Sequence, residues 1–121
     1  MFFVEADLPN RLLVLRWVQR VRAFEVRQAR KQVRDLLGEV KPGFRLLADL
    51  SRLESMDLSC APEIGAMMDL FSEKQVGTIV RVVPDPHKDI GLNIMSRFHY
   101  GSNVRFITCE DLPTALQKLA D

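Results

Sequence analysis

Hydrophobic and polar residues near the start of the chain alternate, as they do in strands. Residues Phe2–Ala6 (FFVEA) alternate imperfectly and predict a short first strand. Residues Arg11–Val18 (RLLVLRWV) predict a second strand, and Leu8-Pro9-Asn10 between the two has the composition of a turn. We therefore expect an antiparallel hairpin. Because the second strand is apolar on both faces, we expect both faces to be partly covered.

The spacing of apolar residues then changes to that of a helix. From Ala23 to Val40, apolar residues recur at i, i+3, i+4 and i+7, which predicts an amphipathic helix. Gly38 and then Lys41-Pro42-Gly43 end it. One flank of this helix is basic, about 110° from the centre of the apolar stripe at about 100° per residue. The members of this basic flank are Arg27, Arg30, Lys31 and Arg34.

The middle of the chain predicts strand, helix and strand in turn. Phe44–Leu50 is apolar almost throughout, as expected for a central strand covered on both faces. Pro62 suits the first turn of a helix and disfavours helical backbone at Ala61, so we predict a helix over Pro62–Gln75. Val76–Val83 is rich in β-branched residues and predicts the next strand.

The last part of the chain repeats this alternation. Ile90–Phe98 predicts a short helix ended by Gly101-Ser102-Asn103, Val104–Cys109 a final strand, and Leu112–Leu119 a terminal amphipathic helix. The order is β-β-α-β-α-β-α-β-α, and strands separated by helices pair in parallel through right-handed crossovers. The sequence thus predicts a single α/β domain over residues 1–121, with a mixed sheet of about five strands and about four helices.

Composition restricts the class of protein further. The 121 residues are 47% hydrophobic and 27% charged, which is typical of one globular domain. Apolar runs are too short to span a bilayer, and MFFVEADLP lacks the basic and apolar regions of a signal peptide. Cys60 and Cys109 have no CxxC spacing. These features predict a reduced, cytoplasmic protein without membrane insertion.

Charge is unevenly distributed although the formal net charge is only +1. Eight Arg or Lys residues lie between Arg11 and Arg34, against the single acid Glu25. Two interpretations of the basic flank stay open: a solvated helix surface, or a docking surface for an acidic partner, a phosphate or an anionic membrane surface. We do not predict nucleic-acid binding, because an aromatic platform and a known reading motif are both missing.

Sequence signatures of enzymes and metal sites are absent. The chain has no GxGxxG, GxxxxGK, HExxH or GxSxG motif and no paired CxxC. His87 and His99 are too far apart in sequence for a metal motif, and we interpret both as structural. We therefore predict no catalytic residue, no metal and no cofactor.

Three side chains near the central strand nevertheless have a chemical alternative. Asp49 and Asp57 could both lie at the C-terminal end of that strand, where α/β proteins bind ligands, or they could cap loops. Cys60 directly precedes the predicted helix, an environment that lowers the pKa of a thiol; a packed, inert thiol is the other interpretation.

Two stretches resemble the STAS domain, the fold of bacterial anti-sigma-factor antagonists and of the related SpoIIAA-like group. LLADLSRLESMDLS resembles the family stretch in which a strand ends in Asp and a connection leads to an Asp-x-Ser pair before a helix; here these are Asp49, Asp57 and Ser59. VRFITCEDLPTALQKL resembles the last strand and the short helix with its Ala-Leu pair, here Ala115-Leu116. The order of elements extends the resemblance over nearly the whole chain.

The chain departs from the family pattern around the serine. In members that are phosphorylated, Gly usually follows the serine and a small hydroxyl residue precedes it. Here Cys60 follows Ser59, Leu58 precedes it, and Pro62 alters the entry into the helix.

The resemblance implies a non-enzymatic regulatory domain that binds a protein partner, such as an anti-sigma factor, a kinase-like protein or another regulator. It further implies a phosphorylation switch at Ser59, with Asp57, Leu58 and Cys60 as contacts, and the basic flank could dock an anionic partner.

Two alternatives stay open. SpoIIAA-like and lipid-carrier folds share this architecture, which implies a module for a small apolar or lipid-like ligand, with the helix Ile90–Phe98 over its pocket. A small enzyme that uses Asp49, Asp57 or Cys60 is the other.

Overall fold

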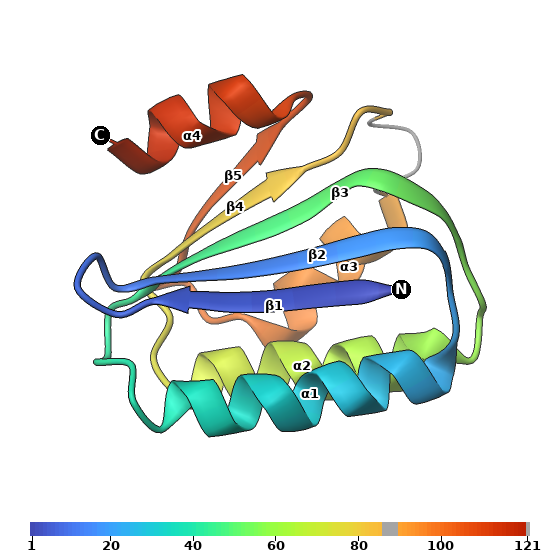
Figure 1. The fold of residues 1–121 in the computed structure, drawn as a ribbon, viewed down its shortest axis with the longest axis horizontal. Helices are drawn as coiled ribbons and strands as arrows, with labels where there is room; N and C mark the ends of the chain where they lie inside the picture. Colours follow the sequence, from blue (N-terminus) through green and yellow to red (C-terminus); the bar gives the residue numbers. More distant parts are fainter. Residues whose placement is uncertain (86–89, 121) are drawn as a thin grey trace.

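The computed structural model describes residues 1–85 and 90–120, so His87 lies outside the described residues. Five strands form one sheet in the order β1-β2-β3-β4-β5 (Figure 1). They are β1 (Phe2–Asp7), β2 (Leu12–Val21), β3 (Arg45–Met56), β4 (Thr78–Val82) and β5 (Arg105–Cys109). The helices are α1 (Ala23–Leu37), α2 (Cys60–Glu73), α3 (Ile90–His99) and α4 (Leu112–Ala120). The predicted order of elements and the α/β class are confirmed.

The pairing of the strands also follows the prediction. β1 and β2 are antiparallel, while β2, β3, β4 and β5 are parallel to one another. β3 is the middle strand, as predicted for the apolar run that begins at Phe44.

Helices cover the two faces of the sheet unequally. α1, α2 and α3 lie on one face and α4 lies on the other (Figure 1). The larger core fills the space between the sheet and the first three helices, with Leu13, Trp17, Val33, Phe44 and Phe71 among its buried members. A smaller core lies under α4 and includes Leu47, Val80 and Leu119. This two-sided burial explains why the central strand is apolar at nearly every position.

Several predicted boundaries were wrong, and the largest error concerns β3. The strand does not end at Leu50 but continues to Met56, through a stretch that we expected to be a connection. β2 likewise continues past Val18 to Val21. The two extensions pair with each other, from Val18 opposite Arg52 to Val21 opposite Met56. The hydrophobic pattern does not indicate this segment because its pairing is with a distant part of the chain, and most of its side chains are exposed.

Asp49 stabilises the irregular part of this pairing. The register between β2 and β3 shifts after Arg16 and again after Gln19, whose φ is 61°. The buried Asp49 carboxylate accepts a hydrogen bond from the Ser51 backbone N–H at 2.9 Å, and Arg16 Nε lies 3.7 Å from its other oxygen. An irregular register diverts a backbone donor from the ladder, and Asp49 satisfies one such donor.

Smaller differences concern the ends of other elements. α1 ends at Leu37, before the predicted end at Val40, because Gly38 caps it. β4 is shorter than Val76–Val83 at both ends. In the part of the chain that the structure describes, we find no helix with the length and apolarity needed to cross a bilayer.

Candidate functional site

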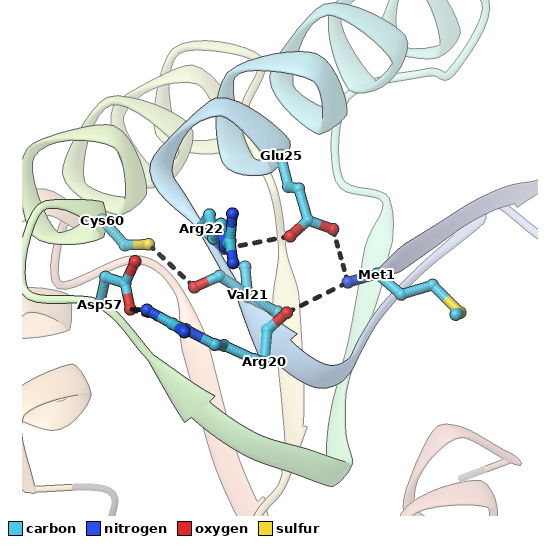
Figure 2. Close-up of polar contacts among 7 residues, drawn as sticks. All are labelled: Met1, Arg20, Val21, Arg22, Glu25, Asp57 and Cys60. Carbon is cyan, nitrogen blue, oxygen red and sulfur yellow. Dashed lines mark hydrogen bonds and ion pairs between the residues drawn. The ribbon is translucent and has the colours of Figure 1, made fainter.

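The extended pairing of β2 and β3 positions the residues that link β3 to α2. We call Asp57, Leu58, Ser59 and Cys60 the 57–60 loop, although Cys60 is also the first residue of α2. The Val21 carbonyl, at the end of β2, accepts the Asp57 backbone N–H at 3.3 Å and the Cys60 Sγ at 3.5 Å. Figure 2 shows Val21 between the loop and the start of α1. Both ends of the loop are therefore fixed to the same strand end.

An ion pair adds a third anchor to the loop. Arg20 Nη2 and Nε donate to Asp57 Oδ1 at 3.2 and 3.3 Å (Figure 2). The two side chains are 59% and 33% exposed, so the pair contributes on the order of 0.2–1 kcal/mol to stability. The contact orients the Asp57 side chain toward β2. Its carboxylate is therefore paired with an arginine and is not a free acid or base.

The start of α1 is held at the same junction. The Glu25 carboxylate accepts the Arg22 backbone N–H at 3.1 Å and pairs with the Met1 amino group at 2.5 Å (Figure 2). The bond from the Met1 ammonium is the main reason why the pKa of Glu25 is lowered from its ordinary value. Glu25 is therefore an anion at neutral pH.

The two middle residues of the loop face the solvent. Leu58 is 94% exposed, the highest value among the large hydrophobic side chains of the described residues. Ser59 is also exposed; it occupies the N-cap position of α2 with φ −63° and ψ −13°, and its hydroxyl caps no backbone N–H. Such helical backbone is unusual for an N-cap residue, which normally adopts an extended conformation that lets the side chain bond back to the helix. The Ser59 hydroxyl is thus accessible to another molecule.

α2 begins two positions before the predicted start at Pro62 because turn bonds extend it backwards. The Cys60 N–H donates to the Asp57 carbonyl at 2.9 Å, and the Ala61 N–H donates to the Leu58 carbonyl at 3.1 Å. Pro62 has no N–H to offer. The first turn of α2 therefore has few free donors, and the loop differs from the usual anion-binding helix terminus.

Cys60 is a packed thiol. Its side chain is 1% exposed, and burial, followed by the negative charge of Asp57, raises its pKa above the ordinary value. Glu25 and Glu63 act in the same direction. The position before a helix does not lower the pKa here, because burial and the surrounding carboxylates outweigh the helix dipole. Cys60 supports the loop from beneath and is not positioned as a contact on its surface.

The basic flank of α1 is partly neutralised within the molecule. Arg27 Nη1 and Arg30 Nη1 lie 3.2 and 3.1 Å from the two carboxylate oxygens of Glu63 in α2. Lys31 and Arg34 are exposed, and within the described ranges we find no ion pair for either. Part of the predicted docking surface is thus a helix–helix contact, and Lys31 and Arg34 are the part that stays available.

The structure does not bring the predicted carboxylates together. Asp49 bonds within β3 and lies near Arg16, whereas Asp57 bonds Arg20 at the strand end. His99 contacts Asp69 of α2, with 2.6 Å between Nδ1 and Oδ1, which agrees with a structural histidine. Over residues 1–85 and 90–120, no group of three or more His, Cys, Asp or Glu is arranged to hold a metal ion.

A groove of about 490 Å³ runs beside the 57–60 loop, between the end of β3 and the start of α3. Its walls are mostly apolar, with Leu53, Met56, Leu92 and Met95 among them, and Leu58 lies at its edge. The cavity between α2, α3 and the sheet measures only about 40 Å³. Since a water molecule needs roughly 10–15 Å³ in the same measure, this inner cavity has room for only a few waters.

Sequence reasoning found the loop but missed what holds it. The contacts of Arg20 and Val21 with the loop were not expected, because they join segments that are far apart in the chain. One signal was present: Arg20 lies at the end of β2 and Asp57 follows β3, and the two can pair once the parallel register is known.

Comparisons with known proteins identify the fold. No family model matches the chain, and no curated protein sequence matches it. Among solved structures, an uncharacterised protein of the DUF3478 family with a SpoIIAA-like fold, from Shewanella loihica PV-4, is similar with a TM-score of 0.73 and 17% identity, over 98% of this chain and 92% of that one. The Bacillus cell fate determinant SpoIIAA in its phosphorylated form gives a TM-score of 0.64 and 16% identity, over 98% and 99%. An anti-sigma factor antagonist from Mycobacterium paratuberculosis gives 0.62 and 15%, over 100% and 94%.

These structural similarities extend over nearly all of each chain, and they confirm the expected resemblance to the SpoIIAA-like, or STAS, fold. At such low identity they establish the fold alone. The function has to be argued from the loop and its surroundings.

The buried position of Cys60 predicts slow thiol chemistry. At pH 8 we expect an aromatic disulfide reagent to modify Cys60 about 100-fold more slowly than a free thiol, because the thiolate population is reduced and access is blocked. The rate should rise steadily as the pH is raised above 9, and unfolding in urea should restore ordinary reactivity. Cys109→Ser removes the second buried thiol as a background signal. A fast reaction of Cys60 at neutral pH in the folded protein would contradict this assignment.

Proposed function

We propose that this chain is a non-enzymatic regulatory domain that binds a protein partner through the 57–60 loop, and that the partner is an anti-sigma factor or a similar regulator. The observation that carries the proposal is the exposure of Leu58 and of the Ser59 hydroxyl on a loop that is anchored at both ends. An anchored loop loses little conformational entropy on binding. The solved structures of this fold that are named as anti-sigma factor antagonists support the choice of partner class.

Leu58 is the hydrophobic anchor of the proposed contact. Exposed hydrophobic residues are common on protein surfaces, but a leucine that is 94% exposed on an anchored loop beside an apolar groove is well placed for binding. Burying it fully in a partner would contribute roughly 1.5–3 kcal/mol. The contact therefore depends on a side chain that has no role in the core of this domain.

Ser59 is the proposed phosphorylation site, and its surroundings make the phosphate disruptive. A phosphate adds about −1.5 to −2 charges at neutral pH. The arginines nearest the loop, Arg20, Arg27 and Arg30, are already paired with Asp57 and Glu63 and are not free to bind the phosphate. Because the first N–H groups of α2 are already bonded, the helix offers the phosphate little stabilisation. The phosphate would therefore repel an acidic contact surface or prevent Leu58 from docking.

The basic flank contributes a second, electrostatic contact in this proposal. Lys31 and Arg34 are its available members, since Arg27 and Arg30 bond Glu63. These side chains would attract an acidic region of the partner and speed its association. The cytoplasmic location expected from the sequence stays a prediction.

Ligand binding is the second candidate function, and the groove beside the loop favours it. The groove, of about 490 Å³, is within the size range of small-molecule sites, and most of its walls are apolar. The cavity of about 40 Å³ beneath α2 and α3 is too small for a lipid-like molecule. An apolar ligand would therefore occupy the surface groove and would compete with a protein bound at Leu58. This alternative stays a prediction.

Substitutions in the loop test the proposal. With the anti-sigma factor encoded nearest in the genome as the probe, we expect Leu58→Ala and Ser59→Asp each to weaken binding by about tenfold or more, because 1.4 kcal/mol corresponds to a factor of ten. Ser59→Ala should bind like the wild type. Each free energy of unfolding should stay within about 0.5 kcal/mol of the wild type, since both side chains are exposed.

Ser102→Asp is the matched control, because it places the same charge at an exposed serine between α3 and β5. It should leave binding unchanged. Equal binding by the wild type, Leu58→Ala and Ser59→Asp would contradict the proposed site.

The basic flank is tested separately by charge reversal. We expect Lys31→Glu combined with Arg34→Glu to weaken the complex about tenfold at low salt, and the difference from the wild type should shrink as the ionic strength approaches 1 M, where the Debye length is only about 3 Å. Arg105→Glu with Lys118→Glu changes the net charge equally at exposed positions elsewhere and is the control. A complex that is insensitive to salt and to the first pair would mean that the flank is a solvated surface.

A further inference from the structure

The outer edge of β1 carries unpaired backbone groups. β1 is an end strand of the sheet and pairs with β2 along its other edge, in an unbroken register from Phe2 opposite Trp17 to Asp7 opposite Leu12. Across the described ranges of the chain, no backbone bond leads from Phe2–Asp7 to any segment other than β2. In Figure 1, β1 is the outermost strand of the sheet, with β2 on one side of it and α1 drawn below it. Such an edge is a template for another strand.

The register shows which residues point their backbone groups outward. The Val18 N–H donates to the Met1 carbonyl at 2.8 Å, so Met1 and Val18 form a hydrogen-bonded pair. In an antiparallel ladder such pairs alternate with non-hydrogen-bonded ones, so Phe3, Glu5 and Asp7 bond toward β2. The N–H and C=O groups of Phe2, Val4 and Ala6 therefore point away from the sheet.

β1 has few of the features that protect most edge strands, and its charged residues are Glu5 and Asp7. Its sequence, FFVEAD, contains no proline and no lysine, and its register with β2 has no bulge within Phe2–Asp7. Phe3 is 47% exposed, and Phe2, Val4 and Ala6 are only partly buried against α1. Natural sheets usually block an edge with a proline, a lysine or a bulge, or cover it.

We propose that β1 is a dimerisation edge, at which a second copy of this chain pairs β1 with β1 about a two-fold axis perpendicular to the sheet. A two-fold axis makes the two strands antiparallel and keeps each face of the sheet continuous across the interface. The proposal is independent of the regulatory function, because it uses the strand farthest from β5 and none of the residues of the 57–60 loop.

One register satisfies every outward group. With Val4 opposite Val4 of the second copy, Phe2 faces Ala6 and Ala6 faces Phe2, so all three outward residues of each strand are paired. A register centred on Phe3 leaves Ala6 unpaired, and one centred on Glu5 leaves Phe2 unpaired and opposes two carboxylates. The strand is thus self-complementary at Val4, which favours a second copy over an unrelated extended peptide.

The side chains agree with this register. Phe3 would lie opposite Glu5 of the second copy on the face that carries α4, so like charges are not opposed. On the other face, Glu25 contacts Met1 and marks the flank of α1 that borders β1. Gln32 and Leu36, which are uncharged, lie on the same flank at helical spacing.

Sedimentation velocity tests the dimer directly. For residues 1–121 tagged only at the C-terminus, we expect a species of twice 13.9 kDa that dissociates on dilution. Val4→Pro removes an outward N–H and should weaken the dimer about tenfold or more, while the fold is kept because proline is tolerated on the open side of an edge strand. Val4→Thr keeps the N–H and should dimerise like the wild type. A monomer at every concentration would overturn the proposal.

Cysteine pairs test the register independently of stability. Non-hydrogen-bonded partners bring Cβ atoms to about 4.5 Å, near the separation that a disulfide needs. A mixture of Phe3→Cys and Glu5→Cys proteins should therefore cross-link under mild oxidation, at least several times faster than either protein alone. Cys60 and Cys109 are buried and contribute little background. Equal cross-linking in the mixture and in the separate proteins, or none in any of them, would overturn the proposed pairing.

Discussion

The candidate site of this molecule depends on the parallel pairing of β2 with β3 beyond the end of the other strands. β4 pairs with β3 only as far as Asp49, whereas β2 stays paired with β3 as far as Met56. This two-stranded extension delivers Asp57 to the Val21 carbonyl and sets the point at which α2 begins. Without it, Leu58 and Ser59 would lie on a longer connection that is free to adopt many conformations.

The arginines of the first third of the chain are used largely within the molecule. Arg16 lies near Asp49, Arg20 bonds Asp57, and Arg27 and Arg30 bond Glu63. Each contact joins β2 or α1 to a later element, and each pairs an acid that lies in β3, in the loop or in α2. Four of the basic residues in this region thus hold β3, the loop and α2 against β2 and α1. Because most of these side chains are partly exposed, the contacts determine geometry more than stability.

The order of elements, the central strand and the α/β class could be predicted, because they depend on hydrophobic period and on turn residues that the sequence shows directly. The length of β3 could not, because residues Ser51–Met56 are held by a distant strand and carry mostly exposed side chains. The start of α2 was misplaced because the rule for Pro62 describes local preference, while the turn bonds of Cys60 and Ala61 extend the helix backwards. Ser59 and Leu58 were found through a family resemblance, and their exposure is what the structure adds.

Cys60 is a second case in which local sequence position and three-dimensional surroundings point to different properties. Position relative to a helix left a reactive and a packed thiol open, and burial together with three neighbouring carboxylates, which raise its pKa, decides for the packed thiol. A side chain in the 57–60 loop can therefore support the loop from below while its neighbours face the solvent.

Amide hydrogen exchange across residues 57–60 tests the anchored loop most directly. The Asp57 and Cys60 amides, which donate to Val21 and Asp57, should exchange slowly, at rates close to those of β3. The Leu58 and Ser59 amides, for which we find no acceptor among the described residues, should exchange fast. This slow-fast-fast-slow pattern is the result that the account predicts. Uniformly fast exchange over all four residues would contradict it, because the loop would then have no fixed conformation in which to present Leu58 and Ser59.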